Sequence, residues 1–328
     1  MSDDLRTSVS RETSRETTPK SVADAEMDGL IEGILADSPI AAAAQRATSF
    51  HHRTGDPLPR PPQPRVFTVA NQKGGVGKTT TTVNLAVALA VHGLNVLVID
   101  LDPQGNASTA LGAEHGSGTP SSYELILGDI EPAEAIQRAT ASENLHVVPA
   151  TIDLAGAEIE LVMLEGREHK LKQVLSSPQI QRRGFDYIFI DCPPSLGLLT
   201  LNAMVAATEV LIPIQCEYYA LEGVGQLLNN IELVRAHLNP RLSISTILLT
   251  MYDARTKLAE QVANEVRGHF GEVVLRTVIP RSVKVSEAPG YGMSVIEYDA
   301  GSRGAMSYLD AGREIANRVR DTVRSSRG

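Results

Sequence analysis

The sequence predicts an α/β fold in which a mostly parallel, twisted β-sheet is covered by helices on both faces. From Val66 onward, short runs rich in β-branched residues alternate with segments of helical apolar spacing, and this alternation is typical of parallel sheets. The runs are apolar throughout instead of alternating with polar residues, as expected for strands that are buried on both faces. The chain has 328 residues, of which 42% are hydrophobic and 21% charged, and this suits one large domain or two small ones.

The apolar runs and the segments between them predict the elements in order. Strands are expected at residues 66–70, 95–100, 145–150, 186–191, 209–214, 243–250 and 273–279. Helices are expected at residues 79–92, 155–176, 197–207, 220–238, 256–270 and 303–325. The pattern contains no internal repeat and no second core, so residues 65–328 are expected to form one domain.

The first 64 residues differ from the rest in composition. They include an opening rich in Ser, Thr, Arg and Glu, an alanine run and, from Pro57, five prolines in eight residues. Because such a segment cannot bury a core of its own, residues 1–64 are predicted to be a disordered tail that ends in an extended, proline-rich linker. Met27, Ile31 and Leu35 have helical spacing, which fits either a partner-docking helix or, as we favour, a transient helix in the tail.

Composition excludes several classes of protein. No apolar run approaches the roughly 18 to 20 residues of a membrane-spanning helix, and the N-terminus lacks the apolar region of a secretory signal. With only two cysteines, Cys192 and Cys216, the chain has no disulfide framework, and both are expected in the core of a cytoplasmic protein. The net charge is −9, but residues 242–328 carry 12 basic and 10 acidic residues. A surface that binds anions is therefore expected in the C-terminal part.

The strongest local signal is KGGVGKTTTTVNLA, which starts at Lys73, follows the first strand and opens the first helix. Glycines at Gly74, Gly75 and Gly77 allow backbone N–H groups to converge on phosphate oxygens without clashes from side chains. The N-terminus of the following helix adds a partial positive charge. The segment is therefore predicted to bind the phosphates of a nucleotide.

Two side chains of the same segment are predicted to complete this phosphate site. Lys78 is expected to reach the β and γ phosphates, and Thr79 is expected to offer its hydroxyl to Mg²⁺. The strict pattern G-x-x-x-x-G-K-[ST] would have glycine where this chain has Gln72, so the loop departs from it. The departure is accompanied by the additional lysine, Lys73.

Acidic residues stand at the ends of two predicted strands, where ligands of open α/β sheets bind. FDYIFIDCPPSLG ends its strand at Asp191, which is expected to organise Mg²⁺ through its water shell. VLVIDLDPQGN places Asp100 on a strand and Asp102 just beyond it. Asp102 is predicted to hold the water that attacks a phosphoanhydride.

At these residues the sequence resembles the deviant Walker A ATPases and, within them, the ParA or Soj ATPases that partition chromosomes and plasmids. The resemblance covers about residues 65–325. It depends on TVANQKGGVGKTTTTVNLA, VIDLDPQGNAST, YIFIDCPPSLG, TMYDARTKL, VIPRSVKVSEAPGYG and YDAGSRGAMSYL. DLDPQGN combined with IPRSVKVSEAPGYG is specific to the partition branch.

The resemblance implies a P-loop NTPase fold of the deviant Walker A type, with ATP as substrate and Mg²⁺ as cofactor. It implies that Lys73 crosses a two-fold interface to the nucleotide of a second subunit, so that Lys73, Lys78 and Asp102 are the catalytic residues. It also implies that any side chain at Gly74 would obstruct the dimer. The ATP contacts expected on this basis are Lys73, Gly74, Gly75, Val76, Gly77, Lys78, Thr79, Thr80, Met251 and Pro280.

The resemblance further implies binding to double-stranded DNA without sequence preference, as an ATP-bound homodimer associated with the nucleoid. It implies a centromere-binding partner of the ParB type that stimulates slow hydrolysis. The DNA-binding candidates are Arg255, Arg281 and Lys284, with Lys257 and Arg303 as weaker ones. Taken without the resemblance, these basic residues fit a solvated surface equally well.

Two other classes of function remain open from the sequence. One is a membrane-associated positioning ATPase of the MinD type, or one that positions another cargo. The last predicted helix places Leu309 and Ile315 on one side, but without Phe or Trp there we expect that side to pack against the sheet and expect no membrane partner. The other class is a biosynthetic amidoligase or kinase, because fold alone does not fix function.

Overall fold

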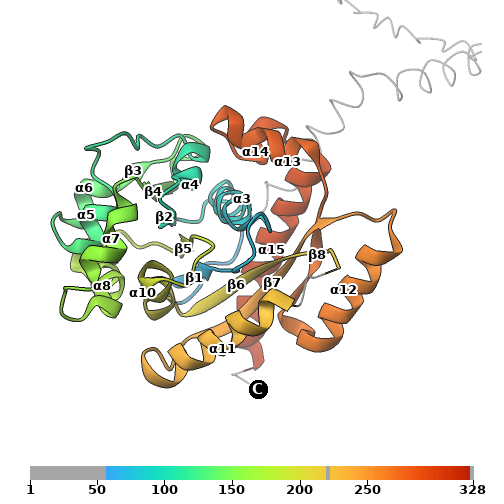
Figure 1. The fold of residues 1–328 in the computed structure, drawn as a ribbon. Coiled ribbons are helices and arrows are strands. Elements are labelled where there is room, and N and C mark those ends of the chain that lie inside the picture. Colours follow the sequence, from blue (N-terminus) through green and yellow to red (C-terminus); the bar gives the residue numbers. More distant parts are fainter. Residues whose placement is uncertain (1–56, 219–221, 326–328) are drawn as a thin grey trace, which may run out of the picture. The chain divides into compact units, whose positions relative to one another are not determined.

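The computed structural model describes residues 57–218 and 222–325, and in this part it has an eight-stranded sheet with the order β3-β4-β2-β5-β1-β6-β7-β8 (Figure 1). The strands are β1 Arg65–Val69, β2 Val96–Asp100, β3 Gln137–Arg138, β4 Leu145–Val148, β5 Tyr187–Asp191, β6 Glu209–Gln215, β7 Ser243–Tyr252 and β8 Val274–Pro280. All neighbouring strands are parallel except β3 and β4, which are antiparallel. The predicted mostly parallel sheet is confirmed.

Helices lie on both sides of this sheet (Figure 1). The longer ones are α3 Lys78–Ala90, α7 Leu154–Leu161, α10 Leu198–Ala206, α11 Glu222–His237, α12 Lys257–Phe270 and α15 Arg303–Ser325. The shorter ones are α4 Asn106–Ala110, α5 Ser122–Leu127, α6 Pro132–Ala135, α8 Lys170–Leu175, α9 Pro178–Gln181, α13 Val283–Glu287 and α14 Val295–Tyr298. Three short 3-10 helices are η1 Arg167–His169, η2 Gly271–Val273 and η3 Ala288–Tyr291.

Two hydrophobic clusters show how the strands are buried on both faces. In β5, Phe189 belongs to the cluster that contains residues of α3 and α15. Its neighbours Ile188 and Ile190 belong to the cluster that contains residues of α8, α10, α11 and α12. Successive side chains of a strand point to opposite faces, so a strand covered on both sides is expected to be apolar at most positions. This is why the apolar runs identified the strands.

The structure corrects one predicted helix. We expected a single helix at residues 155–176, but α7 ends at Leu161 and the chain continues through η1 into α8. Gly166, between α7 and η1, has a φ of 62°, in the left-handed region that a continuous right-handed helix does not contain. The apolar residues keep a helical spacing across this break, so periodicity alone did not reveal it.

The described part of the proline-rich segment packs on the domain. Leu58 is buried among residues of the α3 and α15 side. Nη1 of Arg60 donates to Asp186 Oδ2 at 2.7 Å, and its Nη2 donates to the carbonyl of Gly93 at 2.9 Å. Within the described residues, contacts with the domain are therefore present from Leu58 onward, ahead of the boundary that we expected at Arg65. The predicted disorder and the helical spacing around Ile31 fall outside the described residues.

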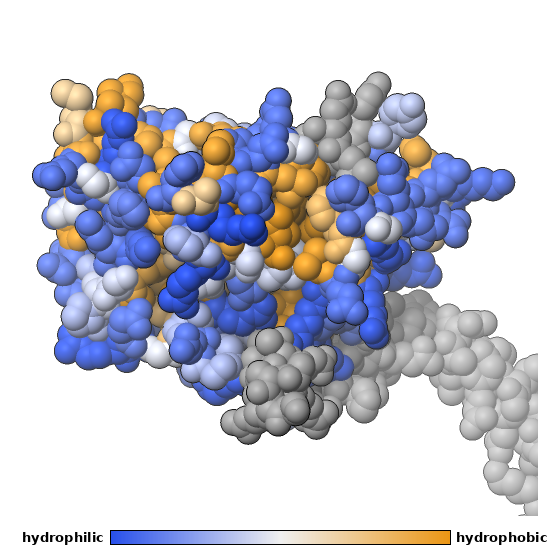
Figure 2. All heavy atoms as spheres, turned by 90° about the horizontal axis from the view of Figure 1, so that it is seen from below, coloured by the Kyte–Doolittle hydropathy of each residue, from blue (hydrophilic) through white to orange (hydrophobic). Residues whose placement is uncertain are grey.

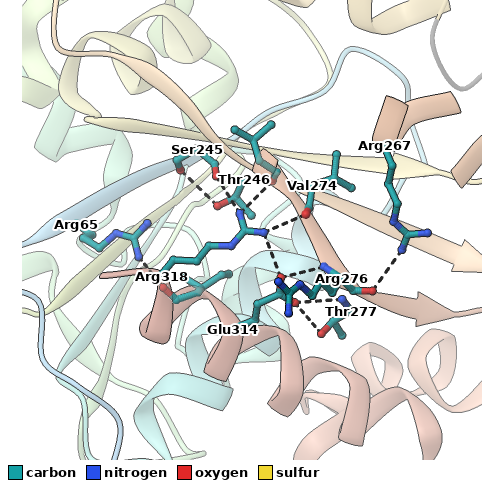
Figure 3. A network of polar contacts seen from close by, with 11 residues as sticks. Arg65, Ser245, Thr246, Arg267, Val274, Arg276, Thr277, Glu314 and Arg318 are labelled. Carbon is teal, nitrogen blue, oxygen red and sulfur yellow. Dashed lines mark hydrogen bonds and ion pairs between the residues drawn. The ribbon is translucent and has the colours of Figure 1, made fainter. Parts of the chain in front are cut away.

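Helix α15 is held against the sheet by a polar network (Figure 3). The carboxylate of Glu314 accepts hydrogen bonds from the backbone N–H groups of Arg276 and Thr277 in β8, at 2.9 and 3.1 Å. Arg318 donates to the carbonyls of Val273 and Val274 at 3.2 and 3.0 Å, and to Glu314 at 3.1 Å. These bonds connect α15 to η2 and to β8, which is the last strand of the sheet.

The apolar side of α15 faces the core, as predicted. Leu309 and Ile315 are 1% and 0% exposed. Across the described ranges, no helix has both the length and the apolar character that crossing a membrane requires. The surface seen from below in Figure 2 mixes hydrophilic and hydrophobic residues.

Candidate nucleotide site

The phosphate loop, residues 70–77, joins the end of β1 to the start of α3. Gly75 and Gly77 have φ values of 73° and 89°, which side chains with a Cβ rarely adopt. The loop is tied to the sheet from two sides. Thr250 Oγ1 donates to the carbonyl of Val76 at 2.8 Å, and Asn71 Nδ2 donates to the carbonyl of Pro213 at 2.8 Å. These two bonds attach the loop to strands β7 and β6.

The two lysines of this loop have different surroundings. Lys78 is only 7% exposed, and its Nζ donates to the carbonyl of Lys73 at 3.4 Å. Burial lowers the pKa of the Lys78 ammonium, whereas the nearby Asp191 opposes that shift. The side chain of Lys73, in contrast, is 37% exposed. A buried ammonium that faces the inside of a loop suits phosphate oxygens of a bound nucleotide.

The surroundings of Asp191 fit a magnesium ion. The carboxyl group is fully buried, and its Oδ1 accepts a hydrogen bond from Thr82 at 2.9 Å, while Oδ2 has no hydrogen-bond partner. Burial, followed by the charge of Asp100, raises the pKa of Asp191 to about 8. A buried carboxylate oxygen without a partner needs a cation, a bound water or a proton. Mg²⁺ in nucleotide sites keeps several waters, so one carboxylate and one hydroxyl are sufficient protein groups.

Thr79 belongs to the same group, because its hydroxyl is near enough to Asp191 to lower the pKa of that carboxyl, against the larger effect of burial. The hydroxyl and the carboxylate, predicted separately as Mg²⁺ partners, therefore lie together. Thr82, one turn further along α3, was missed by the sequence analysis. Its signal was its position four residues after Lys78, which puts both on the same side of the helix.

The two acids after β2 have different roles in the geometry. Asp100 is fully buried and accepts hydrogen bonds from Asp102 N at 3.1 Å and from Ser108 N and Oγ at 2.9 and 2.7 Å. Burial raises the pKa of Asp100 to about 6. Asp102 is half-buried, and its Oδ1 accepts from Gln104 N at 3.0 Å. Asp100 thus holds the local backbone, while Asp102 remains open to water.

A strained residue lies where two of the ATP contacts were expected. Met251 has a φ of 51°, and among the described residues it is the one non-glycine with a positive φ. Such a conformation costs about 1 to 3 kcal/mol and tends to occur at binding sites. Met251 precedes Tyr252, which pairs with Pro280 on β8. Met251 and Pro280, both expected to contact ATP, therefore lie at the ends of neighbouring strands.

Comparison with known proteins agrees with this geometry. A family model described as an AAA domain matches residues 64–244. The protein Soj of Bacillus subtilis, named as a sporulation initiation inhibitor, is 53% identical over 77% of this chain and 98% of its own length. The chromosome partitioning protein ParA of Myxococcus xanthus is 50% identical over 80% of this chain and 91% of its own.

The chain belongs to the ParA/Soj family of chromosome-partition ATPases.

Solved structures place this ParA/Soj family member among P-loop NTPases. One, described as cobyrinic acid a,c-diamide synthase from Mycobacterium smegmatis with an ATP analogue and magnesium, has a TM-score of 0.67 and 41% identity over 78% of this chain and 95% of that one. The cell division ATPase MinD of Pyrococcus furiosus has a TM-score of 0.61 and 29% identity over 76% of this chain and 98% of its own.

The three DNA-binding candidates lie at the surface, and each is paired with an acid. Arg255 forms two hydrogen bonds to Asp253 at 2.9 and 2.8 Å. Arg281 donates to Glu217 at 2.9 Å. The side chains of these two arginines are 86% and 59% exposed. Hydrogen bonds from Arg255, with a smaller contribution from Arg281, lower the pKa of Asp253 to about 2.

Lys284 lies in different surroundings. It forms an ion pair with Glu287 at 3.3 Å, and its ammonium stands 5.3 Å from the ring centre of Tyr298. The acids that pair with the three DNA-binding candidates are Asp253, Glu217 and Glu287. The sequence analysis did not predict these pairs, because each depends on the fold or on local geometry. Arg255 pairs with Asp253, and the N–H of Arg281 donates to the carbonyl of the preceding residue, Tyr252, at 3.0 Å. Lys284 belongs to a separate group around α13 and α14.

Proposed function

We propose that this ParA/Soj family member is an ATP-driven switch for partitioning DNA. Mg²⁺ and ATP bind, two chains dimerise around the nucleotides, and the dimer binds DNA without sequence preference. Hydrolysis, stimulated by a ParB-type partner, separates the dimer and releases the DNA. The observation that carries the proposal is the arrangement of buried Lys78 and the unpartnered, buried Oδ2 of Asp191 beside the phosphate loop.

Nucleotide binding follows from groups that the loop already orients. The backbone N–H groups around Gly75 and Gly77 hold the phosphate oxygens, and Lys78 neutralises charge on the β and γ phosphates. Thr79 and Asp191 would hold Mg²⁺, which supplies charge neutralisation at the phosphates.

Hydrolysis is assigned to Asp102, which is half-buried and can orient a water. The water adds to the γ-phosphorus, the bond from phosphorus to the β–γ bridging oxygen breaks, and ADP and phosphate are formed. Asp100 contributes by fixing the backbone of Asp102.

Dimerisation is supported by Lys73 and Gly74. The ammonium of Lys73 is on a partly exposed side chain, so it is available to the nucleotide of a second chain. A Cβ added to Gly74 would meet no atom of its own chain within 4 Å. The requirement for glycine at this position therefore fits a close approach by another chain, where any side chain would intervene.

DNA binding is assigned to Arg255 and Arg281, with Lys284 as a further candidate. Binding without sequence preference needs contacts to phosphates, and its strength depends on how many phosphates are neutralised. A single chain offers few such contacts. A two-fold dimer doubles them, so DNA binding becomes dependent on ATP.

A second candidate function is ligation of a small molecule. One solved relative is described as a cobyrinic acid a,c-diamide synthase, with identity of 41%. We favour the partition switch because the curated relatives with the greater identity to this chain are named for partition or as Soj.

An ATPase assay distinguishes these functions. We expect hydrolysis to increase with plasmid DNA and a ParB-type peptide, and the stimulation by DNA to fall as salt is raised. Stimulation by lipid vesicles instead of DNA would indicate a MinD-type positioning protein. Formation of an amidated product would indicate ligation.

A further inference from the structure

Glu217 follows strand β6 and contacts two basic residues from distant parts of the chain. Its Oε1 accepts a hydrogen bond from Arg281 at 2.9 Å, and its Oε2 lies 4.0 Å from the ammonium of Lys73. The side chain of Glu217 is 44% exposed. The carboxylate of Glu217 therefore forms ion pairs with both Lys73 of the phosphate loop and Arg281, which is expected to bind DNA.

The sheet order explains this double contact. Lys73 follows β1, Glu217 follows β6, and Arg281 follows β8. Strand β6 lies beside β1, and only β7 separates β6 from β8. The carboxyl ends of parallel strands meet at one edge of a sheet. Glu217 therefore stands between the nucleotide side and the DNA side of that edge.

The backbone around Glu217 is fixed to the neighbouring strand. The N–H of Cys216 donates to the carbonyl of Thr250 in β7 at 3.1 Å, and Cys216 is buried. In addition, the N–H of Arg281 donates to the carbonyl of Tyr252 at 3.0 Å. The backbones that carry the acid and the arginine are thus both anchored to β7, while their side chains remain free to exchange partners with solvent or a ligand.

Acids and bases are interspersed along this edge. We call the group of Lys73, Glu217, Arg281, Asp253 and Arg255 the charged edge. Glu217 pairs with Lys73 and with Arg281, and Asp253 pairs with Arg255. A carboxylate and a phosphate oxygen offer a guanidinium the same kind of acceptor. Each phosphate that reaches these bases must therefore compete with a carboxylate that is already there.

We propose that Glu217 is a positioning residue that holds Lys73 and Arg281 in the nucleotide-free chain and competes with phosphate oxygens for both of them. This inference rests on the proposed function and adds an element of regulation to it. Glu217 keeps DNA affinity low before ATP binds, because Arg281 is occupied. It also keeps Lys73 turned towards its own chain until a nucleotide of a second subunit draws it away.

The size of the effect follows from exposure. Pairs between exposed side chains are weak and are screened by salt. We therefore expect Glu217→Gln to raise the affinity for DNA about 3- to 10-fold at low salt, with a smaller gain at high salt. The gain should be greatest without nucleotide, since in the ATP-bound dimer the other contacts dominate.

The test uses the full chain and a matched control. Glu232→Gln removes the same charge from α11, where Glu232 pairs with Arg235 at 3.1 Å away from the charged edge. The affinity for a labelled DNA duplex of arbitrary sequence is measured without nucleotide, with Mg·ADP and with Mg·ATP. We expect Glu217→Gln to raise the nucleotide-free affinity, and Glu232→Gln to leave it within about 2-fold. Equal effects of the two variants, or weaker binding by Glu217→Gln, would overturn the proposal.

A second background separates positioning from a general charge effect. In an Arg281→Ala chain, Glu217→Gln should no longer change the DNA affinity measured without nucleotide, because the residue through which it acts is gone. It should still lower the ATP concentration needed for dimerisation, because Lys73 is still released. A full gain in DNA affinity in the Arg281→Ala background would contradict the proposed route. Unchanged melting temperatures of the variants check that the fold is retained.

The proposed function and this inference fail in different ways. If the unmodified chain binds no DNA in any nucleotide state, the proposed function is wrong. In that case the ATP concentration needed for dimerisation tests the role of Glu217. If Glu217→Gln needs the same ATP concentration as the unmodified chain, the inference is overturned as well. If the unmodified chain binds DNA only with ATP but Glu217→Gln behaves like Glu232→Gln, the function stands and only the inference is wrong.

Discussion

At the scale of single residues, burial separates side chains that look alike in the sequence. Lys73 and Lys78 lie in one loop, but only Lys78 is buried. Asp100 and Asp102 are two residues apart. The carboxylate of Asp100 accepts three hydrogen bonds within the chain, whereas that of Asp102 accepts one. Buried Lys78 is thus suited to the nucleotide of its own chain, while partly exposed Lys73 and half-buried Asp102 are left to act on a second chain and on a water.

Asp102 provides the first prediction. Asp102→Ala removes the proposed water-orienting carboxylate without touching Lys78 or Asp191, so ATP binding should persist while hydrolysis falls about 100-fold or more. The variant should accumulate as an ATP-bound dimer on DNA. Phosphate release and nucleotide affinity are measured in parallel. Loss of ATP binding, or hydrolysis at the normal rate, would show that Asp102 does something else.

Asp191 provides the second prediction, through pH. Burial raises its pKa to about 8 in the folded chain, from 3.8. The folded form therefore keeps a proton that the unfolded chain has lost, and without metal this carboxyl contributes less stability as pH rises from about 4 to about 8. Mg²⁺ takes the place of that proton, so the rise in melting temperature caused by Mg·ADP should be larger at about pH 8 than at about pH 6.

The control for this prediction is Asp191→Asn, which cannot titrate. In that variant the effect of Mg²⁺ on the melting temperature should be small and nearly independent of pH. An effect of Mg·ADP that is equal at both pH values in the unmodified chain would contradict the role given to Asp191.

Sequence alone identified those site residues that are close together along the chain. The glycines, Lys78 and Thr79 occupy one segment with a recognisable spacing, and Asp191 ends an apolar strand. Glu217 was not found, because its partners lie about 140 residues before and about 60 residues after it. The conformation of Met251 was likewise not foreseen, since a positive φ at a non-glycine depends on its surroundings.

At the scale of elements, the prediction succeeded where burial is uniform. The strands are apolar at most positions because helices cover both faces, and each predicted strand lies within a few residues of the observed one. Short elements such as β3, α4 and α14 were missed, because they hold too few residues for a period to show. The break at Gly166 was missed for the opposite reason, since the periodicity continues across it.

Helix α15 provides the third prediction. Glu314 accepts hydrogen bonds from two backbone N–H groups of β8 and from Arg318 (Figure 3). Glu314→Ala leaves these donors without that acceptor, so the free energy of unfolding should fall by about 1 to 3 kcal/mol. Glu232→Ala, which removes an exposed pair on α11, should change it by less than about 0.5 kcal/mol. Urea unfolding measures the free energy of unfolding of both variants. An equal loss in the two would mean that the α15 network contributes little to stability.

At the scale of the whole molecule, the end of the proline-rich segment belongs to the domain. Leu58 is buried and Arg60 forms an ion pair with Asp186, and neither contact could be read from a composition that indicates a linker. The composition of a segment indicates whether it can form a core of its own. It does not indicate whether one of its side chains packs into the core of a neighbouring domain. Residues 1–56 carry none of the motifs of the nucleotide site.

This gives the fourth prediction, a comparison of two truncations. A chain that starts at Pro57 should keep the thermal stability and basal ATPase of the full chain. A chain that starts at Arg65 should lose about 2 kcal/mol of stability, because it lacks the buried Leu58. Thermal and urea unfolding measure both. Equal stability of the two truncated chains would show that the contacts of Leu58 and Arg60 contribute little.

The fifth prediction concerns the central claim, that the γ-phosphate converts a chain that binds DNA weakly into a dimer that binds it well. The direct measurement is sedimentation of the full chain with a DNA duplex of arbitrary sequence, in Mg·ATP and in Mg·ADP, with Lys78→Ala as the control. We expect a dimer that sediments with DNA in ATP, a monomer with little bound DNA in ADP, and a Lys78→Ala chain that stays monomeric in both. The same mass and the same DNA retention in ATP and ADP, or dimerisation of Lys78→Ala like that of the unmodified chain, would contradict the claim.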